Sequence, residues 1–400
     1  MKPLRRGQGD ERWGAPTQRP GPVPQGILSS QRLHSLQASL SEEPPQYTLE
    51  DMRLLYHFSN HTAMTLSDVP EAQLAWGTSA IQVAFKHPFL LQGILALSAL
   101  HLTSLEGRTT RETERLSIVA ASKQDAALRE FRSKVGHITR QNCNSLFAFS
   151  FLTEFYIPAS AGTVINPSAT FMNNNLFEAV LDWLRLHRGT SDIYKRHGDW
   201  LAAGPLAALF WGDVLNTDSR VPSQRASLVL PSSAHNAQYF LDLWTAIKSN
   251  SNIIEDRDAS ASAEGQDEAN EVNLQVLMIL VDIFSRTQIF NKPNQATTAE
   301  LHRSPRQFQS DQHPPNVVNK PYYLGLSFSW LFRVPARYVE LLERRQPASL
   351  IIFAHFALLL HNAPRFWWNK GMSAKIVKAV SAVLPAQCQQ YIKLPIQEIL

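Results

Sequence analysis

The run from Leu350 to Leu360 constrains the fold of this chain more than any other segment, because His355 is its one polar residue. Pro347 precedes the run and suits the first turn of a helix, where the amide that proline lacks has no intrahelical partner. A helix that is apolar all round has no face for water, so it packs among other helices or spans a membrane. The run is far shorter than the roughly 20 residues that a bilayer requires. The sequence therefore predicts a helix buried inside the protein.

An aromatic turn follows this helix. Phe366, Trp367 and Trp368 place three rings together, and Gly371 comes three residues later. The rings have a large apolar area, and each indole N–H needs a hydrogen-bond acceptor when it is buried. Such a turn suits a corner of the core or the wall of a pocket.

The rest of the chain predicts further helices and no strands, because apolar residues recur at helical spacing and strand-like alternation persists nowhere. No repeat period is evident. We therefore predict an all-α fold, a multi-helix array or bundle over residues 47–400. The expected helices, besides the buried one, cover 48–58, 71–86, 88–106, 109–134, 144–157, 171–187, 201–215, 237–249, 272–290, 322–332 and 336–345.

Four segments are expected to lie outside the helices. Residues 1–46 are basic and rich in proline, which predicts a disordered tail; a DNA-contacting arm or a nuclear-import signal is the alternative. Residues 255–271 hold seven acidic residues and one arginine, so we expect a solvated loop, with an acidic activation surface as the alternative. Residues 158–167 and 295–321 read as a turn-rich linker and a polar, proline-rich loop.

Composition narrows the class of protein. With 44% hydrophobic and 18% charged residues, 400 residues can bury one large core. The net charge of +4 is modest for a dedicated nucleic-acid binder. No apolar segment follows the basic start, and polar residues interrupt the longest apolar run, from Phe89 to Leu105. We expect neither a secretory signal nor a membrane span.

Three segments carry a family resemblance: 347–372, YTLEDMRLLYHFSNHTAMTL at 47–66, and AFKHPFLLQGILALSALHL at 84–102. Together they resemble the C-terminal regulatory domain of fungal binuclear zinc-cluster transcription factors, in particular the sterol uptake control proteins. The likeness extends over about residues 46–395 and is weakest in the middle third. It implies an all-helical regulatory domain in a nuclear protein, shared with the cytoplasm in some cases. It further implies a homodimer or transcriptional co-regulators as partners, and control of RNA polymerase II transcription of sterol or secondary-metabolite genes.

The cysteines depart from that family. A binuclear zinc cluster needs six cysteines in a short N-terminal module, whereas this chain has only Cys143 and Cys388. We expect no zinc in this chain, and contact with DNA only through a module missing here or through a partner. The competing hypothesis is a stand-alone apolar-ligand-binding or scaffold protein without DNA binding.

Catalytic and metal-binding motifs are missing from the sequence. It contains no G-x-S-x-G elbow and no glycine-rich phosphate loop, so we predict that the protein is not an enzyme. His57 and His61 have the i, i+4 spacing that lets two imidazoles meet one metal, but no third ligand is evident. We interpret them as a solvent-side pair and predict no metal site and no cofactor.

The aromatic C-terminal third has two interpretations. Such clusters usually form plain core, but they also line pockets for rigid apolar ligands, which have apolar walls and few polar groups. The sterol-binding regulatory domain of the resembling proteins favours a pocket for a sterol or another apolar ligand. We predict that eight residues line it: Phe328, Trp330, Phe353, His355, Phe356, Leu359, Trp367 and Trp368.

Overall fold

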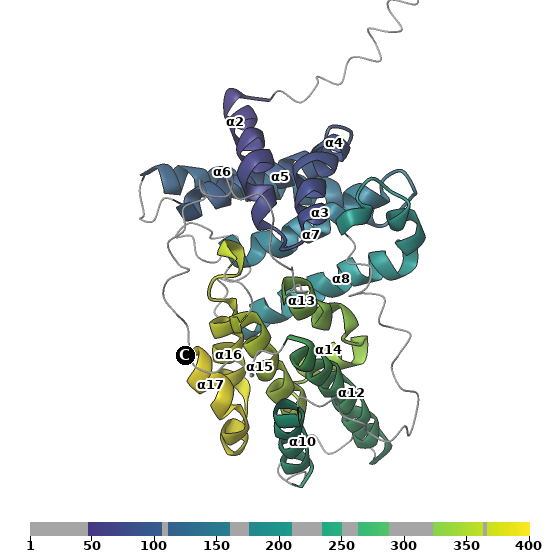
Figure 1. The fold of residues 1–400 in the computed structure, drawn as a ribbon, viewed down its shortest axis with the longest axis vertical. Coiled ribbons are helices and arrows are strands. Elements are labelled where there is room, and N and C mark those ends of the chain that lie inside the picture. Colours follow the sequence, from purple (N-terminus) through teal and green to yellow (C-terminus); the bar gives the residue numbers. More distant parts are fainter. Residues whose placement is uncertain are drawn as a thin grey trace, which may run out of the picture. The chain divides into compact units, whose positions relative to one another are not determined.

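Helices are the only regular elements in the described part of the chain (Figure 1). The computed structural model describes residues 47–105, 111–160, 176–209, 234–249, 263–287, 323–362 and 366–400. No strand occurs within these ranges, so the all-α prediction is confirmed. The predicted tail at 1–46 and the predicted loop at 295–321 lie outside the described residues.

The first elements surround one apolar helix, α5 (Pro88–Leu105). It packs against α2, α4, α6 and α7. Among the described helices, α5 alone is long and apolar enough to cross a bilayer, yet 67% of it is buried inside the protein, as in a core helix. The other elements of this region are α2 (Leu49–His57), a π-helical turn (Phe58–Thr62), a 3-10 turn (Ala63–Thr65), α3 (Pro70–Leu74), a second π-helical turn (Ala75–Ser79), α4 (Ala80–Ala84) and α6 (Arg111–Val135).

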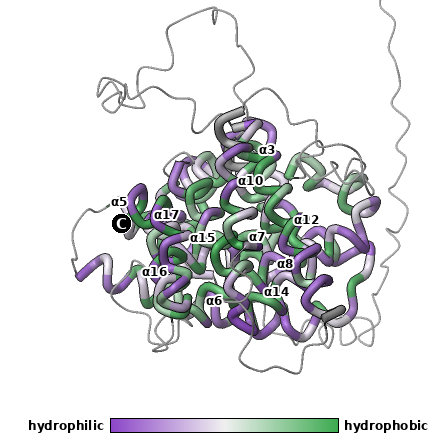
Figure 2. The backbone as a smooth tube through the Cα atoms, turned by 90° about the horizontal axis from the view of Figure 1, so that it is seen from below, coloured by the Kyte–Doolittle hydropathy of each residue, from purple (hydrophilic) through white to green (hydrophobic). Residues whose placement is uncertain are grey.

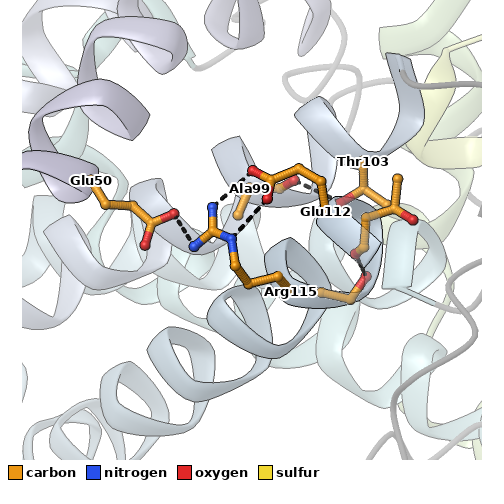
Figure 3. A network of polar contacts seen from close by, with 7 residues as sticks. Glu50, Ala99, Thr103, Glu112 and Arg115 are labelled. Atoms are coloured by element: carbon orange, nitrogen blue, oxygen red, sulfur yellow. Dashed lines mark hydrogen bonds and ion pairs between the residues drawn. The ribbon is translucent and has the colours of Figure 1, made fainter. Parts of the chain in front are cut away.

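Ion pairs join α2 to α6. Figure 3 shows Arg115 of α6 between Glu50 of α2, at 2.5 Å, and Glu112 of its own helix, to which it donates two hydrogen bonds of 2.9 and 2.8 Å. Lys123 and Asp51 form a second, more buried pair between the same helices. Because exposed pairs contribute about 0–1 kcal/mol each, their main effect is to orient α2 on α6.

The linker expected at 158–167 is wrong for its first residues, because helix α7 (Cys143–Ser160) continues through Pro158. Proline lacks the amide that would bond the carbonyl four residues earlier, which here belongs to Glu154. The indole Nε1 of Trp183 donates to that carbonyl at 3.4 Å and replaces the missing partner. Trp183 belongs to α8 (Leu176–Ala202), which packs along α7.

Two further expectations are wrong at helix boundaries. Helix α8 continues through a kink at His197 to Ala202, so no separate helix begins at Leu201. A 3-10 turn (Ala207–Leu209) follows, and residues 210–215 of the expected helix lie outside the described residues. Helix α12 (Ala263–Thr287) includes the second half of the expected acidic loop at 255–271, whose first half lies outside the described residues. Alanine and glutamate favour helix, Ala269 is buried, and Glu268 contacts Arg337 at 3.5 Å.

The buried helix is confirmed as α15 (Pro347–Asn362), in which every residue from Ala348 to Leu360 is buried. Helices α12, α14, α16 and α17 pack around it. In Figure 2, hydrophobic segments gather toward the interior of the helical array and hydrophilic segments toward its outside. The neighbouring elements are α10 (Ala234–Ser249), α13 (Tyr323–Arg333) and α14 (Ala336–Glu343).

The aromatic turn after α15 forms a 3-10 turn (Trp367–Asn369). Gly371 follows with φ +78°, a left-handed conformation that glycine adopts without strain, and it redirects the chain into α16 (Met372–Val383). Helix α16 and the two elements beyond it were not predicted from the sequence. The two elements are a 3-10 helix (Ala386–Ile392) and α17 (Lys393–Ile399).

Candidate ligand-binding region

Three of the eight predicted pocket residues form one aromatic stack. Trp330 of α13 lies nearly parallel to Phe356 and Phe353 of α15, with ring centroids 4.3 and 6.1 Å away. All three side chains are fully buried. The indole Nε1 of Trp330 donates to the Val276 carbonyl at 3.4 Å, so the polar atom of the stack is satisfied. This arrangement is tightly packed core.

The imidazole of His355 contacts Tyr239 and Phe240 of α10. Its Nδ1 is 2.8 Å from the Ile351 carbonyl, and a carbonyl only accepts, so Nδ1 carries the proton. The other nitrogen, Nε2, is 2.8 Å from the Tyr239 hydroxyl and accepts a hydrogen bond from it. Burial lowers the pKa of His355 to about 4 and raises the pKa of Tyr239 to about 12. The pair is therefore neutral, with a half-buried tyrosine as its outer member.

The two tryptophans of the turn dock on the N-terminal helices. Trp367 Nε1 donates to the Thr65 hydroxyl at 2.8 Å, and Trp368 Nε1 donates to the Thr65 carbonyl at 3.1 Å. The Trp367 ring also stacks on His101, with centroids 4.8 Å apart. Each indole N–H thus has an acceptor, and both acceptors are oxygen atoms of Thr65.

Trp368 completes a second aromatic group. Its ring lies 4.6 Å from Phe155 of α7 and 5.5 Å from both Phe328 and Phe366. Leu359 is buried on α15, one turn beyond His355. Apart from Leu359, the predicted residues therefore divide into the Trp330 stack, the His355 pair and the group around the two tryptophans. Among the described residues, no ring contact joins the first group to the last.

A histidine cluster lies under Trp367. His57 Nε2 is 3.2 Å from His101 Nδ1, which is also 3.0 Å from the Thr62 hydroxyl. Burial, and then the neighbouring imidazoles, lower the pKa of both histidines to about 4. His57 is buried and His61 is exposed, so the expected solvent-side pair is wrong for His57. Within the described ranges, no group of three or more histidine, cysteine or acidic residues could hold a metal.

Sequence reasoning missed a fully buried pair, Glu154 of α7 and His187 of α8. Glu154 Oε2 and His187 Nε2 are 3.3 Å apart, and both side chains are inaccessible to solvent. His187 donates from Nδ1 to the Trp183 carbonyl at 2.9 Å, which leaves a lone pair on Nε2. Burial raises the pKa of Glu154 to about 8 and lowers that of His187 to about 3. A protonated carboxyl group therefore faces a neutral imidazole. The available signal was Glu154 itself, the one charged residue of α7.

Comparison with known proteins finds a family match in the first part of the chain. Residues 53–201 match the family described as the fungal specific transcription factor domain. The resemblance drawn from the three sequence segments is thereby confirmed.

Three relatives show how far the similarity extends. A Zn(2)-C6 fungal-type transcription factor of Gibberella zeae is 21% identical over 341 residues, which are 82% of this chain and 56% of that protein. Orsellinic acid/F9775 biosynthesis cluster protein D of Emericella nidulans is 37% identical over 68 residues, 16% of this chain and 13% of that protein. Sterol uptake control protein 2 of Candida albicans is 29% identical over 103 residues, 26% of this chain and 14% of that protein. The matched part of the chain covers 56% of the first of these relatives and 13% and 14% of the other two.

The region that matches the fungal specific transcription factor domain provides the surface on which the aromatic turn docks. Thr65, His101 and Phe155 all lie within residues 53–201, and each contacts Trp367 or Trp368. The C-terminal part of the chain is thus hydrogen-bonded to this region, because Trp367 donates to Thr65, which lies 302 positions earlier in the sequence.

Proposed function

We propose that this chain is the regulatory, ligand-sensing region of a fungal zinc-cluster-type transcription regulator that acts in the nucleus. The observation that carries the proposal is the match of residues 53–201 to the fungal specific transcription factor domain. The Zn(2)-C6 relative along most of the chain supports it. Transcription factors are not enzymes, and we propose no catalytic activity.

The proposed target genes serve sterol uptake and synthesis or a secondary-metabolite cluster, and RNA polymerase II transcribes them. Two relatives support these classes, since one is named as a sterol uptake control protein and another as a member of a biosynthesis cluster. We further propose that the chain acts as a homodimer or with transcriptional co-regulators.

The proposed ligand is a sterol or another rigid apolar molecule held near α13, α15 and the aromatic turn. The eight predicted residues are aromatic or aliphatic except His355, and apolar walls with few polar groups are typical of such sites. Tyr239 is half-buried, so a ligand hydroxyl that displaces its OH would find His355 Nε2 as an acceptor. A ligand that shifts α15 or α16 would also strain the indole hydrogen bonds to Thr65, which connect these helices to the transcription factor domain.

A reporter assay tests the regulatory role. Residues 47–400 are fused to a heterologous DNA-binding module in yeast, and reporter transcription is measured while an azole depletes sterols. We expect transcription to change with sterol supply, and Thr65→Val to reduce that response because Trp367 loses its acceptor. Thr78→Val is the matched control, since the Thr78 hydroxyl is exposed and donates to the Leu74 carbonyl four residues earlier. A reporter that stays silent under all conditions would favour the scaffold hypothesis.

Thermal unfolding tests the ligand. A ligand that binds only the folded form stabilises it by about 2.7 kcal/mol at a hundredfold excess over Kd, so ergosterol should raise the melting temperature. Replacing His355 or Trp368 should reduce that rise more than it lowers the melting temperature without ligand. If a panel of sterols near saturation leaves the melting curve unmoved, the aromatic residues are plain core and control passes through protein partners.

A further inference from the structure

The histidines under Trp367 lie where the first described helix meets the core helix α5. His57 ends α2, His61 belongs to the π-helical turn that follows, and His101 belongs to α5. The ring centroid of His57 is 5.1 Å from that of His61 and 5.0 Å from that of His101. Nε2 of His57 and Nδ1 of His101 are 3.2 Å apart. We call these three residues the histidine cluster.

The bond between His57 and His101 depends on their protonation. A neutral imidazole has one N–H and one lone pair, so one ring can donate to the other. If both rings are protonated, both facing nitrogens carry a hydrogen atom and neither accepts. The Thr62 hydroxyl, 3.0 Å from Nδ1 of His101, can accept from that ring, but the N–H of His57 then has no acceptor in this contact. Earlier in α2, the bond of 2.7 Å from Ser98 to the Leu54 carbonyl contains no titratable group, so the loss is confined to the end of the helix.

Burial and neighbouring positive charge oppose this protonation. Burial is the largest cause for both rings. The charges of His61 and Arg53 add to it at His57. The charges of His57 and His61 add to it at His101. Both pKa values fall from 6.5 to about 4, and among the described residues no carboxylate raises either of them. The folded protein therefore holds the two rings neutral.

The elements packed around the histidine cluster expose their carboxylates or pair them with other residues. α4, the second π-helical turn, the 3-10 turn (Ala63–Thr65) and the aromatic turn contain no charged residue, and His101 is the one titratable residue of α5. Lys370, which follows the aromatic turn, is exposed. The acidic residues of α2, α6 and α7 divide as follows: Glu50 and Glu112 contact Arg115, Asp51 contacts Lys123, Glu130 contacts Lys134, Glu154 contacts His187, and Glu114 and Asp125 are exposed.

Trp367 is bound to both sides of the contact between the first helix and α5. Its Nε1 donates at 2.8 Å to the hydroxyl of Thr65, in the 3-10 turn that continues the first helix, and its ring stacks on His101 with centroids 4.8 Å apart. If the segment His57–Thr65 moves away from α5, the indole can keep only one of these contacts. A cation on the face of an indole is attractive, so we expect the stack on His101 to persist and the bond to Thr65 to break.

We propose that the histidine cluster is an acid-operated latch, which releases Thr65 from the indole of Trp367 when His57 and His101 are protonated together. Because both pKa values are lowered in the closed state, the contribution of the cluster to that state is complete above about pH 6.5 and is lost as pH falls toward 4. Opening removes a hydrogen bond between the C-terminal part of the chain and the region that matches the fungal specific transcription factor domain. The inference uses only contacts and charges within the described residues, so it does not depend on the proposed function.

The expected size of the effect follows from the two pKa values. With a pKa of 6.5 in the open state and about 4 in the closed state, lowering the pH from about 7.5 to about 5 raises the open population about 30-fold for each histidine. The two histidines together raise it several hundredfold. A hydrogen-bonded N–H exchanges with water through open states, so exchange of the Trp367 indole hydrogen measures this population.

Hydrogen exchange followed by NMR, on the full chain isotopically labelled at its tryptophan nitrogens, tests the proposal. Trp367→Phe assigns the Trp367 signal. We expect the protection of Trp367, corrected for the intrinsic effect of pH on exchange, to fall at least about a hundredfold between about pH 7.5 and about pH 5. Trp330, bonded to the Val276 carbonyl in the core, should remain at least about tenfold better protected than Trp367 at the lower pH.

A double variant assigns the effect to the histidines. His57→Gln combined with His101→Asn retains hydrogen-bonding amides in place of the imidazoles but removes their titration, so the protection of Trp367 should no longer fall with pH. The matched control combines His137→Gln with His361→Gln, at exposed histidines elsewhere, and should behave like the parent.

Three results would overturn the proposal. The first is protection of Trp367 that does not change between the two pH values. The second is equal protection of Trp367 and Trp330 at the lower pH, which would mean that the whole protein unfolds. The third is the same fall in the variant without His57 and His101 as in the parent. Circular dichroism checks that this variant is folded, and if it is not, the comparison of Trp367 with Trp330 in the parent decides alone.

Discussion

Replacing Phe356 with alanine tests whether α15 is the centre of the C-terminal core. The ring is fully buried and stacks 4.3 Å from Trp330 and 6.0 Å from Phe353, so the change removes a whole aromatic side chain and leaves a cavity. Phenylalanine-to-alanine changes at such sites cost about 3–5 kcal/mol, of which an aromatic pair contributes about 0.5–1.5 kcal/mol. Folded domains are stable by only about 5–15 kcal/mol, so the variant should lose a large part of its folding free energy.

Urea denaturation followed by far-UV circular dichroism measures this loss. Phe85→Ala is the matched control, because Phe85 is 64% exposed and its replacement should change the free energy of unfolding by less than about 0.5 kcal/mol. Phe353→Ala should behave like Phe356→Ala, since Phe353 belongs to the same stack. If Phe356→Ala and Phe353→Ala unfold at the same urea concentration as Phe85→Ala, α15 is not a buried core helix and the architecture described above is wrong.

Three further predictions concern polar groups and charge. Burial raises the pKa of Glu154 to about 8, so its contribution to the free energy of unfolding is largest below its ordinary pKa and declines as pH rises toward 8. Glu154→Gln should remove that decline when the free energy of unfolding is measured from pH 5 to 8. If the variant and the parent show the same dependence on pH, Glu154 is ionised in the folded protein. Tyr239→Phe should cost about 1–3 kcal/mol in urea denaturation, because it leaves His355 Nε2 buried without a donor; a variant as stable as the parent would contradict the hydrogen bond. Without a six-cysteine module in its 400 residues, the purified chain should bind duplex DNA weakly, without sequence preference and less as salt rises; a sequence-selective, salt-resistant gel shift would refute this.

Local pattern was sufficient to predict α15. Because His355 is the one polar residue between Leu350 and Leu360, this run has no face for water, and the structure buries every residue of it. The requirement that each indole of the aromatic turn find an acceptor followed from chemistry alone and is met at Thr65. The family resemblance followed from three short segments of sequence.

Composition was a weaker guide than helix propensity at the acidic segment. Residues 263–271 are polar and acidic, which predicted a loop, yet they form the first turns of α12. Glutamate and alanine favour helix, and Ala269 gains burial while Glu268 contacts Arg337 of α14. At Pro158 the reverse holds, because a helix-breaking residue is tolerated where Trp183 supplies the hydrogen bond that proline cannot.

The sequence by itself determined the fold class, the burial of α15 and the need for acceptors around the two tryptophans, because these depend on residues within one or two helical turns of each other. Only the tertiary structure decided which polar groups meet. Glu154 faces His187, His57 faces His101, and Thr65 receives both indoles, across separations that no periodicity encodes. The same holds for the predicted pocket, whose ring-bearing residues belong to three different groups. Side-chain direction around a helix follows from its spacing, whereas the partner it meets depends on how distant helices pack.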